Sequence, residues 1–275
     1  MDRDAADARN RAFLRPSTPV PAPVPPRKVS GRPAVDRGGM TRTVLAVWAH
    51  PDDEAYLCAG FLAAARAAGS RVVVATATRG EAGLTDPEGA RVRAGELRES
   101  LDAIGVTEHR WLQAAVPLYD GSLAEVPEEV GVAAVAAVVA DVRPDLVLTF
   151  GPDGMTGHDD HRAVSGWTTR AVEGSGAELW YAALTGDWLA EWGGLCAETG
   201  VWMTGPPEPA TDPVYVSRLA GELLDAKVAA LAAHRSQTAG LIALVGEERY
   251  RSWWSTETFV VARTARAALE EEEAA

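Results

Sequence analysis

The chain has 275 residues, 47% of them hydrophobic and 24% charged, which is enough to bury a full core in one domain. Its formal net charge is −13, and because residues 1–40 carry +4, the remainder carries −17, which disfavours nucleic-acid binding. Cys58 and Cys196, the two cysteines of the sequence, form no CxxC pair, which argues against a disulfide framework or a thiolate zinc site.

The two ends of the chain differ in composition from its middle. Residues 1–40 contain seven of the 17 prolines and few core-forming residues, which predicts a disordered Pro-rich arm. Residues 266–275 include four consecutive glutamates and are predicted to form an acidic tail, so we expect the folded domain over residues 41–265. No apolar stretch approaches the roughly 20 residues of a membrane span, and no apolar signal segment is present, so we expect no span and a cytoplasmic location.

Between these ends, β-rich runs alternate with helix-forming segments. The predicted strands cover residues 44–49, 71–78, 110–113, 146–150, 179–184 and 258–261. The predicted helices cover residues 54–68, 90–104, 130–142, 160–172 and 216–233. Alternation at this spacing indicates crossover connections between parallel strands. We therefore predict an α/β fold, a doubly wound and mostly parallel sheet with helices on both faces, as in a Rossmann-like three-layer sandwich.

Two histidine-bearing motifs follow predicted strands, the first directly and the second across the loop at residues 151–156. His50-Pro-Asp-Asp-Glu54 follows the first strand, and Gly157-His158-Asp-Asp-His161 follows the strand at 146–150. In an open α/β sheet, ligands bind beyond the carboxyl ends of the strands, where both motifs are expected to lie. Each motif alone is more typical of a capped, solvated helix start. Their combination in matching positions favours a metal site.

The residue types in these motifs suit a catalytic zinc ion, which needs about three nitrogen or oxygen ligands and one open position. His50 and Asp53 are three residues apart on a turn, and His161 can complete the ligand set from the other loop. Asp52 can then act as the general base for a water molecule. His158 can stabilise the oxyanion that forms when water adds to a carbonyl. These are the parts of a metal hydrolase that acts on an acyl group.

The same motifs carry a family resemblance. A-H-P-D-D-E at 49–54 together with G-H-x-D-H at 157–161 resembles the signature of the LmbE-like, or PIG-L, family of zinc-dependent N-deacetylases. Weaker supporting segments lie at residues 78–83, 93–96, 120–121, 144–145, 233–237 and 257–259. The resemblance spans about residues 43–263. It implies the same zinc ligands, general base and oxyanion stabiliser as the chemistry of the motifs.

The resemblance also implies two substrate contacts. In relatives that act on amino sugars, an arginine of an R-x-x-E segment and a later aspartate contact the substrate, and the matching residues are Arg93 and Asp120. Other interpretations stay open for both. Arg93 and Glu96 have the spacing of a surface ion pair on a helix, and Asp120-Gly121 favours a turn in its own right.

We therefore expect zinc-dependent hydrolysis of an N-acyl amide, above all an N-acetyl amide, on an amino sugar or its conjugate, which releases acetate and a free amine. One zinc ion per chain is expected, although Fe²⁺ suits the same ligands. The expected partner is a small-molecule substrate containing the amino sugar, and no feature indicates an oligomeric state.

Three alternatives to this function remain: an amidase of thiol or antibiotic conjugates, a phosphoester hydrolase, and a non-catalytic metal- or glycan-binding protein. One further segment bears on the substrate, because four tryptophans lie between residues 180 and 202. A substrate-facing role is slightly favoured for Trp188 and Trp192, with a place in the core as the alternative.

Overall fold

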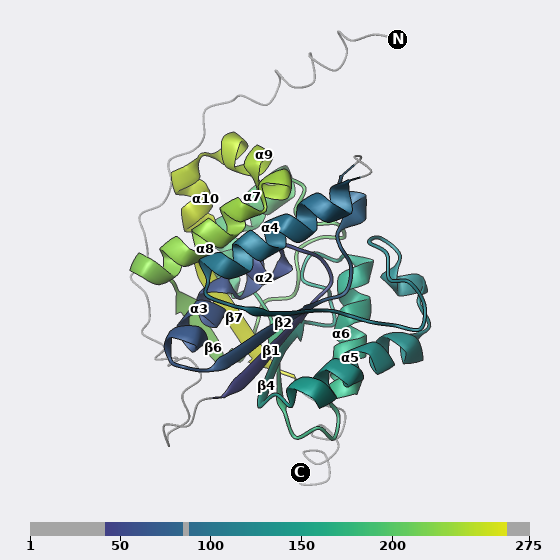
Figure 1. Ribbon diagram of the computed structural model, residues 1–275. Helices are drawn as coiled ribbons and strands as arrows, with labels where there is room; N and C mark the ends of the chain where they lie inside the picture. The colour runs from purple at the N-terminus through teal and green to yellow at the C-terminus, as the bar shows by residue number, and fades with distance from the viewer. Residues whose placement is uncertain (1–41, 85–87, 263–275) are drawn as a thin grey trace, which may run out of the picture. The chain divides into compact units, whose positions relative to one another are not determined.

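The computed structural model describes residues 42–84 and 88–262 (Figure 1). Seven strands among these residues form one sheet in the order β3-β2-β1-β4-β5-β7-β6. The strands are β1 (Thr43–Trp48), β2 (Arg71–Thr76), β3 (Glu108–Trp111), β4 (Leu146–Phe150), β5 (Glu178–Ala182), β6 (Tyr215–Arg218) and β7 (Thr256–Val261). Neighbours from β3 to β5 are parallel, whereas β7 runs antiparallel to both β5 and β6. The predicted arm at 1–40 and tail at 266–275 lie outside the described residues.

The sheet is the middle layer of a three-layer sandwich. Helices α5 (Glu128–Val142) and α6 (Asp159–Val172) pack together over β1 and β4 on one face, whereas α3 (Ala59–Ala67), α4 (Gly89–Ala103) and α8 (Gly221–Ala233) form the other outer layer (Figure 1). Because both faces are covered, β4 is fully buried and β1 is buried from Val44 onward, which explains their mostly apolar sequences. The predicted mostly parallel α/β fold is confirmed.

The helix predicted over residues 54–68 is divided by Cys58, whose φ of −149° is not helical. The products are α2 (Asp53–Leu57) and α3. The carboxylate of Glu257 in β7 accepts hydrogen bonds from Gly60 N at 2.9 Å and Phe61 N at 2.7 Å, and so satisfies the first turn of α3. Lys227 of α8 donates to the same carboxylate at 2.8 Å, and both side chains are fully buried. This ion pair ties α3 to α8 and β7.

The second half of the chain departs furthest from the predicted elements. The helix predicted over residues 216–233 is wrong at its start, because residues 215–218 pair with β7 as the strand β6 and only the remainder is α8. Three helices were not predicted: α7 (Gly186–Glu198), α9 (Arg235–Val245) and α10 (Glu247–Trp253).

Among the described residues, helices α4 and α5 have 15 residues each. No single helix there is long and apolar enough to cross a membrane. Helices α8 and α9 are long and apolar enough only when they are taken together, and they are bent by 113° where they meet.

Candidate metal centre and active site

The two histidine motifs meet because β1 and β4 are parallel neighbours in the sheet. The loop after β1 begins with Ala49 and His50, and the loop after β4 leads to His158, where α6 starts. Both loops leave the carboxyl edge of the sheet, so their side chains share one site.

His50, Asp53 and His161 form a compact buried triad. His50 Nδ1 lies 3.2 Å from His161 Nε2 and 3.7 Å from Asp53 Oδ2, and His161 Nε2 lies 3.3 Å from Asp53 Oδ1. Three ligands of one tetrahedral ion, each bonded at about 2.0–2.1 Å, would stand roughly 3.3 Å apart. The spacing of the donor atoms and their burial therefore fit a divalent metal ion.

The outer nitrogens of both imidazoles have partners that fix which nitrogen carries the proton. His161 Nδ1 lies 3.0 Å from the carbonyl oxygen of Gly154, which only accepts, so Nδ1 donates and Nε2 is free to bind metal. His50 Nε2 lies 3.0 Å from Asp120 Oδ1 and 3.1 Å from Asp160 Oδ2, so Nε2 donates to these carboxylates and Nδ1 faces the other two residues of the triad. Carbonyl and carboxylate partners of this kind orient metal-binding histidines.

The electrostatics of the triad favour a cation. Burial lowers the pKa of His50, but hydrogen bonds with Asp120 and Asp160 outweigh it and raise the pKa to about 10. Burial and the positive charge of His50 hold the pKa of His161 well below its usual range, so this imidazole stays neutral. The carboxylates thus stabilise positive charge at the triad. A divalent ion would supply that charge in place of the proton.

Asp52 lies beside the triad in a rare backbone conformation, with φ 120° and ψ −27°. Two contacts hold it there: its N–H donates to Glu54 Oε2 at 3.0 Å, and Arg93 Nη2 lies 3.2 Å from its Oδ2. Burial raises the pKa of Asp52 to about 7 against the opposing charge of Arg93. A carboxylate that titrates near neutrality suits a general base.

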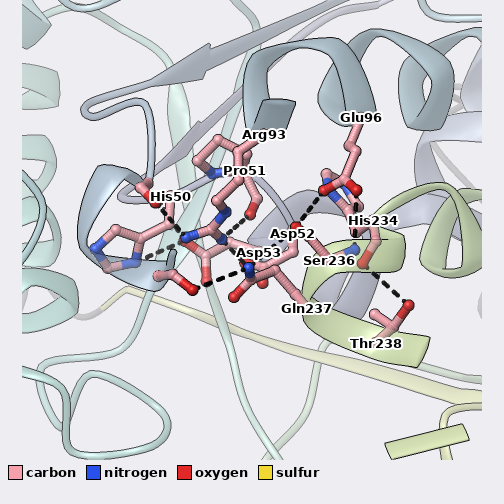
Figure 2. A network of polar contacts seen from close by, with 12 residues as sticks. His50, Pro51, Asp52, Asp53, Arg93, Glu96, His234, Ser236, Gln237 and Thr238 are labelled. Atoms are coloured by element: carbon pink, nitrogen blue, oxygen red, sulfur yellow. Dashed lines mark hydrogen bonds and ion pairs between the residues drawn. The ribbon is translucent and has the colours of Figure 1, made fainter. Parts of the chain in front are cut away.

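Arg93 projects from α4 towards the loop that contains Asp52 (Figure 2). Its guanidinium donates to the carbonyl of Gly80 at 3.0 Å and to the carbonyl of Pro51, and the residue is only 4% exposed. Glu96 is buried as well, and it accepts hydrogen bonds from the N–H and hydroxyl of Ser236 at 2.9 and 2.6 Å. The interpretation of Arg93 and Glu96 as a surface ion pair is therefore wrong.

Gly80 makes room for this guanidinium. It has φ 68°, and a Cβ added there would collide with the side chain of Arg93. We expect Gly80→Ala to displace Arg93 from the loop and to lower kcat/KM for the amide substrate by roughly 10²-fold, because small misplacements near reacting groups are costly. Gly105→Ala is the matched control, since Gly105 has φ 70° with open space around its Cβ. Equal activity of the two variants would contradict this role for Gly80.

His158 caps the start of α6. Its Nδ1 accepts a hydrogen bond from Asp160 N at 3.1 Å, so the proton sits on Nε2. The ring centroid lies 4.9 Å from that of His50 and 4.8 Å from that of His161. His158 therefore brings a donor next to the triad without belonging to it, and its role as oxyanion stabiliser remains a prediction.

Asp160 was missed as a site residue. It is 1% exposed and, besides contacting His50, it accepts hydrogen bonds from Gly121 N at 2.7 Å and Leu123 N at 2.8 Å. Its place between the two histidines of the second motif was the available signal. Asp120, predicted to contact substrate, instead contacts His50 and accepts from Ala82 N at 3.1 Å, so its substrate role stays a prediction.

A cavity of about 480 Å³ opens beside the triad. Its lining includes the predicted site residues His50, Asp52, Asp53, Arg93, Asp120, His158 and His161. Trp188 and Trp202 of the tryptophan-rich segment also line it, as does Trp254, which the sequence did not single out. Trp192 does not, because it stacks on Trp253 with ring centroids 6.5 Å apart. The prediction of a substrate-facing Trp192 is therefore wrong.

A doubly wound sheet with a buried His-Asp-His metal site and a free carboxylate beside it defines a metal-dependent hydrolase. Residues 45–172 match the PIG-L family, described as GlcNAc-PI de-N-acetylase. The 1D-myo-inositol 2-acetamido-2-deoxy-alpha-D-glucopyranoside deacetylase of Kineococcus radiotolerans is 34% identical in an alignment that covers 74% of this chain and 71% of that protein. The enzyme of the same name from Rhodococcus jostii is 32% identical over 71% of this chain and 82% of its own length. The chain belongs to the PIG-L family.

Solved structures share the fold. A conserved protein of Thermus thermophilus superposes with a TM-score of 0.55 at 26% identity, covering 81% of this chain and 95% of that one. The N,N'-diacetylchitobiose deacetylase of Pyrococcus horikoshii has a TM-score of 0.52 at 22% identity, covering 80% and 84%. At such low identity the second likeness concerns the fold alone. The resemblance drawn from the two motifs is thus confirmed.

Proposed function

We propose that the chain is a zinc-dependent N-deacetylase that hydrolyses the N-acetyl amide of an amino sugar carried on a small molecule. The observation that carries this proposal is the buried His50, Asp53 and His161 triad with Asp52 beside it in the same cavity. The activities named for the related inositol-linked glucosamine deacetylases support the choice of bond and sugar. We also propose that residues 41–265 form the metal hydrolase domain.

His50 Nδ1, Asp53 and His161 Nε2 would hold one zinc ion, or Fe²⁺ in its place. The ion, when bound, lowers the pKa of water beside it and polarises the amide carbonyl. Asp120, Asp160 and the carbonyl of Gly154 keep the two imidazoles oriented towards it. These contacts make the triad rigid before any substrate arrives.

The protein's own part in the reaction begins with Asp52. Its carboxylate accepts a proton from the attacking water as the new C–O bond forms at the carbonyl carbon. The same proton then passes from Asp52 to the amide nitrogen, the C–N bond breaks, and acetate and a free amine leave. Arg93 fixes the loop and the carboxylate of Asp52 in the position that this transfer needs.

His158 acts on the carbonyl oxygen. Because its Nδ1 accepts from Asp160 N, its Nε2–H is available to donate to the negative charge that develops on this oxygen. Arg93 and Asp120 line the same cavity and are proposed to contact sugar hydroxyls. Arg93 would donate and Asp120 would accept, through hydrogen-bonding positions that their contacts within the protein do not use.

The test is an assay for acetate release from N-acetylglucosaminyl inositol and from N-acetylglucosamine glycosides, with metal content measured on the same sample. We expect release of acetate and amine in equal amounts and one zinc ion per active chain. Hydrolysis of thiol or antibiotic amides without activity on amino sugars would support the amidase alternative. Two ions per chain together with phosphoesterase activity would refute the proposal.

A further inference from the structure

Four aromatic rings form a continuous row along the cavity, and the deacetylation chemistry does not use them. Tyr56 lies 4.6 Å from Trp254, Trp254 lies 5.9 Å from Trp188, and Trp188 lies 6.4 Å from Trp202, measured between ring centroids. All four residues line the cavity that contains the triad. We call Tyr56, Trp254, Trp188 and Trp202 the aromatic row.

The polar atoms of the aromatic row either form hydrogen bonds with other protein groups or are buried. Trp188 Nε1 donates to the carbonyl of Trp253 at 3.2 Å, and Trp202 Nε1 donates to that of Gly193 at 3.3 Å. Trp254 Nε1 is buried without a partner, and the hydroxyl of Tyr56 is bonded to that of Tyr250 at 2.9 Å. The row therefore presents apolar surface and offers no indole donor to a bound sugar or inositol.

Aliphatic side chains extend this apolar surface to solvent. Leu241 of α9 and Met203 line the same cavity, and Met203 is 63% exposed. A single exposed methionine is ordinary, but this one lines the same cavity as the aromatic row. An unbranched, polarizable side chain at that place adapts to apolar ligands of different shape.

The cavity is poorly suited to an anionic or fully hydroxylated extension of the substrate. Among the described residues that line it, Arg93 is the only arginine or lysine, and its positive charge is already paired with Asp52. Several carboxylates line the cavity as well. Hydroxyl groups placed against the aromatic row would lose water without gaining partners, which is unfavourable.

We propose that the cavity selects N-acylated amino sugars that carry an apolar group, which packs against the aromatic row, Leu241 and Met203. The apolar group is an alkyl or aryl aglycone or an acyl chain longer than acetyl. This inference rests on the proposed deacetylase function and narrows its substrate class.

The test compares kcat/KM of the zinc-loaded enzyme across two substrate series, all kept below their micelle concentrations. One series lengthens the glycoside of N-acetylglucosamine from methyl to butyl to octyl, and the other lengthens the acyl group of the methyl glycoside in the same steps. We expect kcat/KM to rise about fourfold for each methylene that becomes buried, in at least one series. A rise in the glycoside series alone assigns the aromatic row to the aglycone, and a rise in the acyl series alone assigns it to the acyl chain.

Substitutions in the cavity lining test whether these side chains cause the preference for longer chains. Met203→Ser and Leu241→Ser should reduce the ratio of kcat/KM between octyl and methyl substrates by about tenfold, because each removes apolar surface from the cavity. Leu244→Ser is the matched control on α9, since Leu244 is 71% exposed and does not line the cavity, and it should leave that ratio unchanged.

The outcomes separate this inference from the proposed function. Hydrolysis of the methyl glycoside with no gain from longer chains overturns the apolar preference and leaves the deacetylase intact. A preference for chitobiose or the inositol conjugate over the octyl substrate does the same, because it assigns the aromatic row to sugar stacking. No hydrolysis of any of these amides overturns both.

Discussion

Asp52→Ala is expected to abolish turnover while the divalent ion stays bound. Asp52 is not one of the three triad residues, so its removal leaves the ligand set of His50, Asp53 and His161 unchanged. Loss of a general base costs typically 10²–10⁴-fold in rate. The measurement is kcat on an acetylated amino sugar, with zinc content determined on the same preparation. Full metal occupancy with at least a hundredfold lower kcat is the expected result.

Alanine also removes the contact with Arg93 in a strained loop, so a second variant is needed. Asp52→Asn keeps an oxygen for the Arg93 contact, and asparagine tolerates positive φ better than most residues. If loop geometry were the cause of inactivity, the asparagine variant would recover most of the activity. Activity above a tenth of wild type in either variant would show that another group takes the proton.

The central sheet and the metal motifs could be predicted because their determinants are local. Strands β1 and β4 are buried on both faces, so each gives a mostly apolar run, and a motif follows each run. The parallel order of these strands follows from the helices between them, and it places both motifs at one edge. The three residues of the triad are the ones predicted from the two motifs, and the structure brings their donor atoms within 4.8 Å of one another.

Features that depend on distant partners could not be predicted in this way. The break at Cys58 is stabilised by Glu257, which lies 197 residues beyond Gly60. Asp160 is held by N–H groups of Gly121 and Leu123, 39 and 37 residues earlier in the chain. A single sequence contains no sign of such contacts.

The surroundings of the tryptophan rings could not be predicted for a related reason. The spacing of Trp188 and Trp192 indicates a shared helix face, but not what covers each ring. One ring lines the cavity, and the other packs on Trp253 of α10, a helix that was not predicted. Trp202 lies in a loop without periodicity, so its place among the four tryptophans between residues 180 and 202 was the signal that the sequence offered.

His161→Ala is expected to lose the divalent ion and, with it, all activity. It removes one of three buried ligands and leaves His50 Nδ1 and Asp53 to bind the ion alone. Zinc content after dialysis should fall from about one ion per chain to well below it. The matched control is His158→Ala, three residues earlier, which should keep the ion and lose roughly 10²–10³-fold in kcat through the missing donor.

Stability distinguishes a lost ligand from a damaged core, because the His161 ring also stacks on Phe150 with centroids 4.1 Å apart. Its removal is expected to lower Tm with or without metal, so the informative quantity is the change in Tm on adding zinc. Free zinc at 100 times its Kd stabilises a protein that binds it only when folded by about 2.7 kcal/mol. Wild type and His158→Ala should show this rise and His161→Ala should not. A zinc-dependent rise in His161→Ala equal to that of wild type would mean that the ion is held elsewhere, and the proposed metal centre would be wrong.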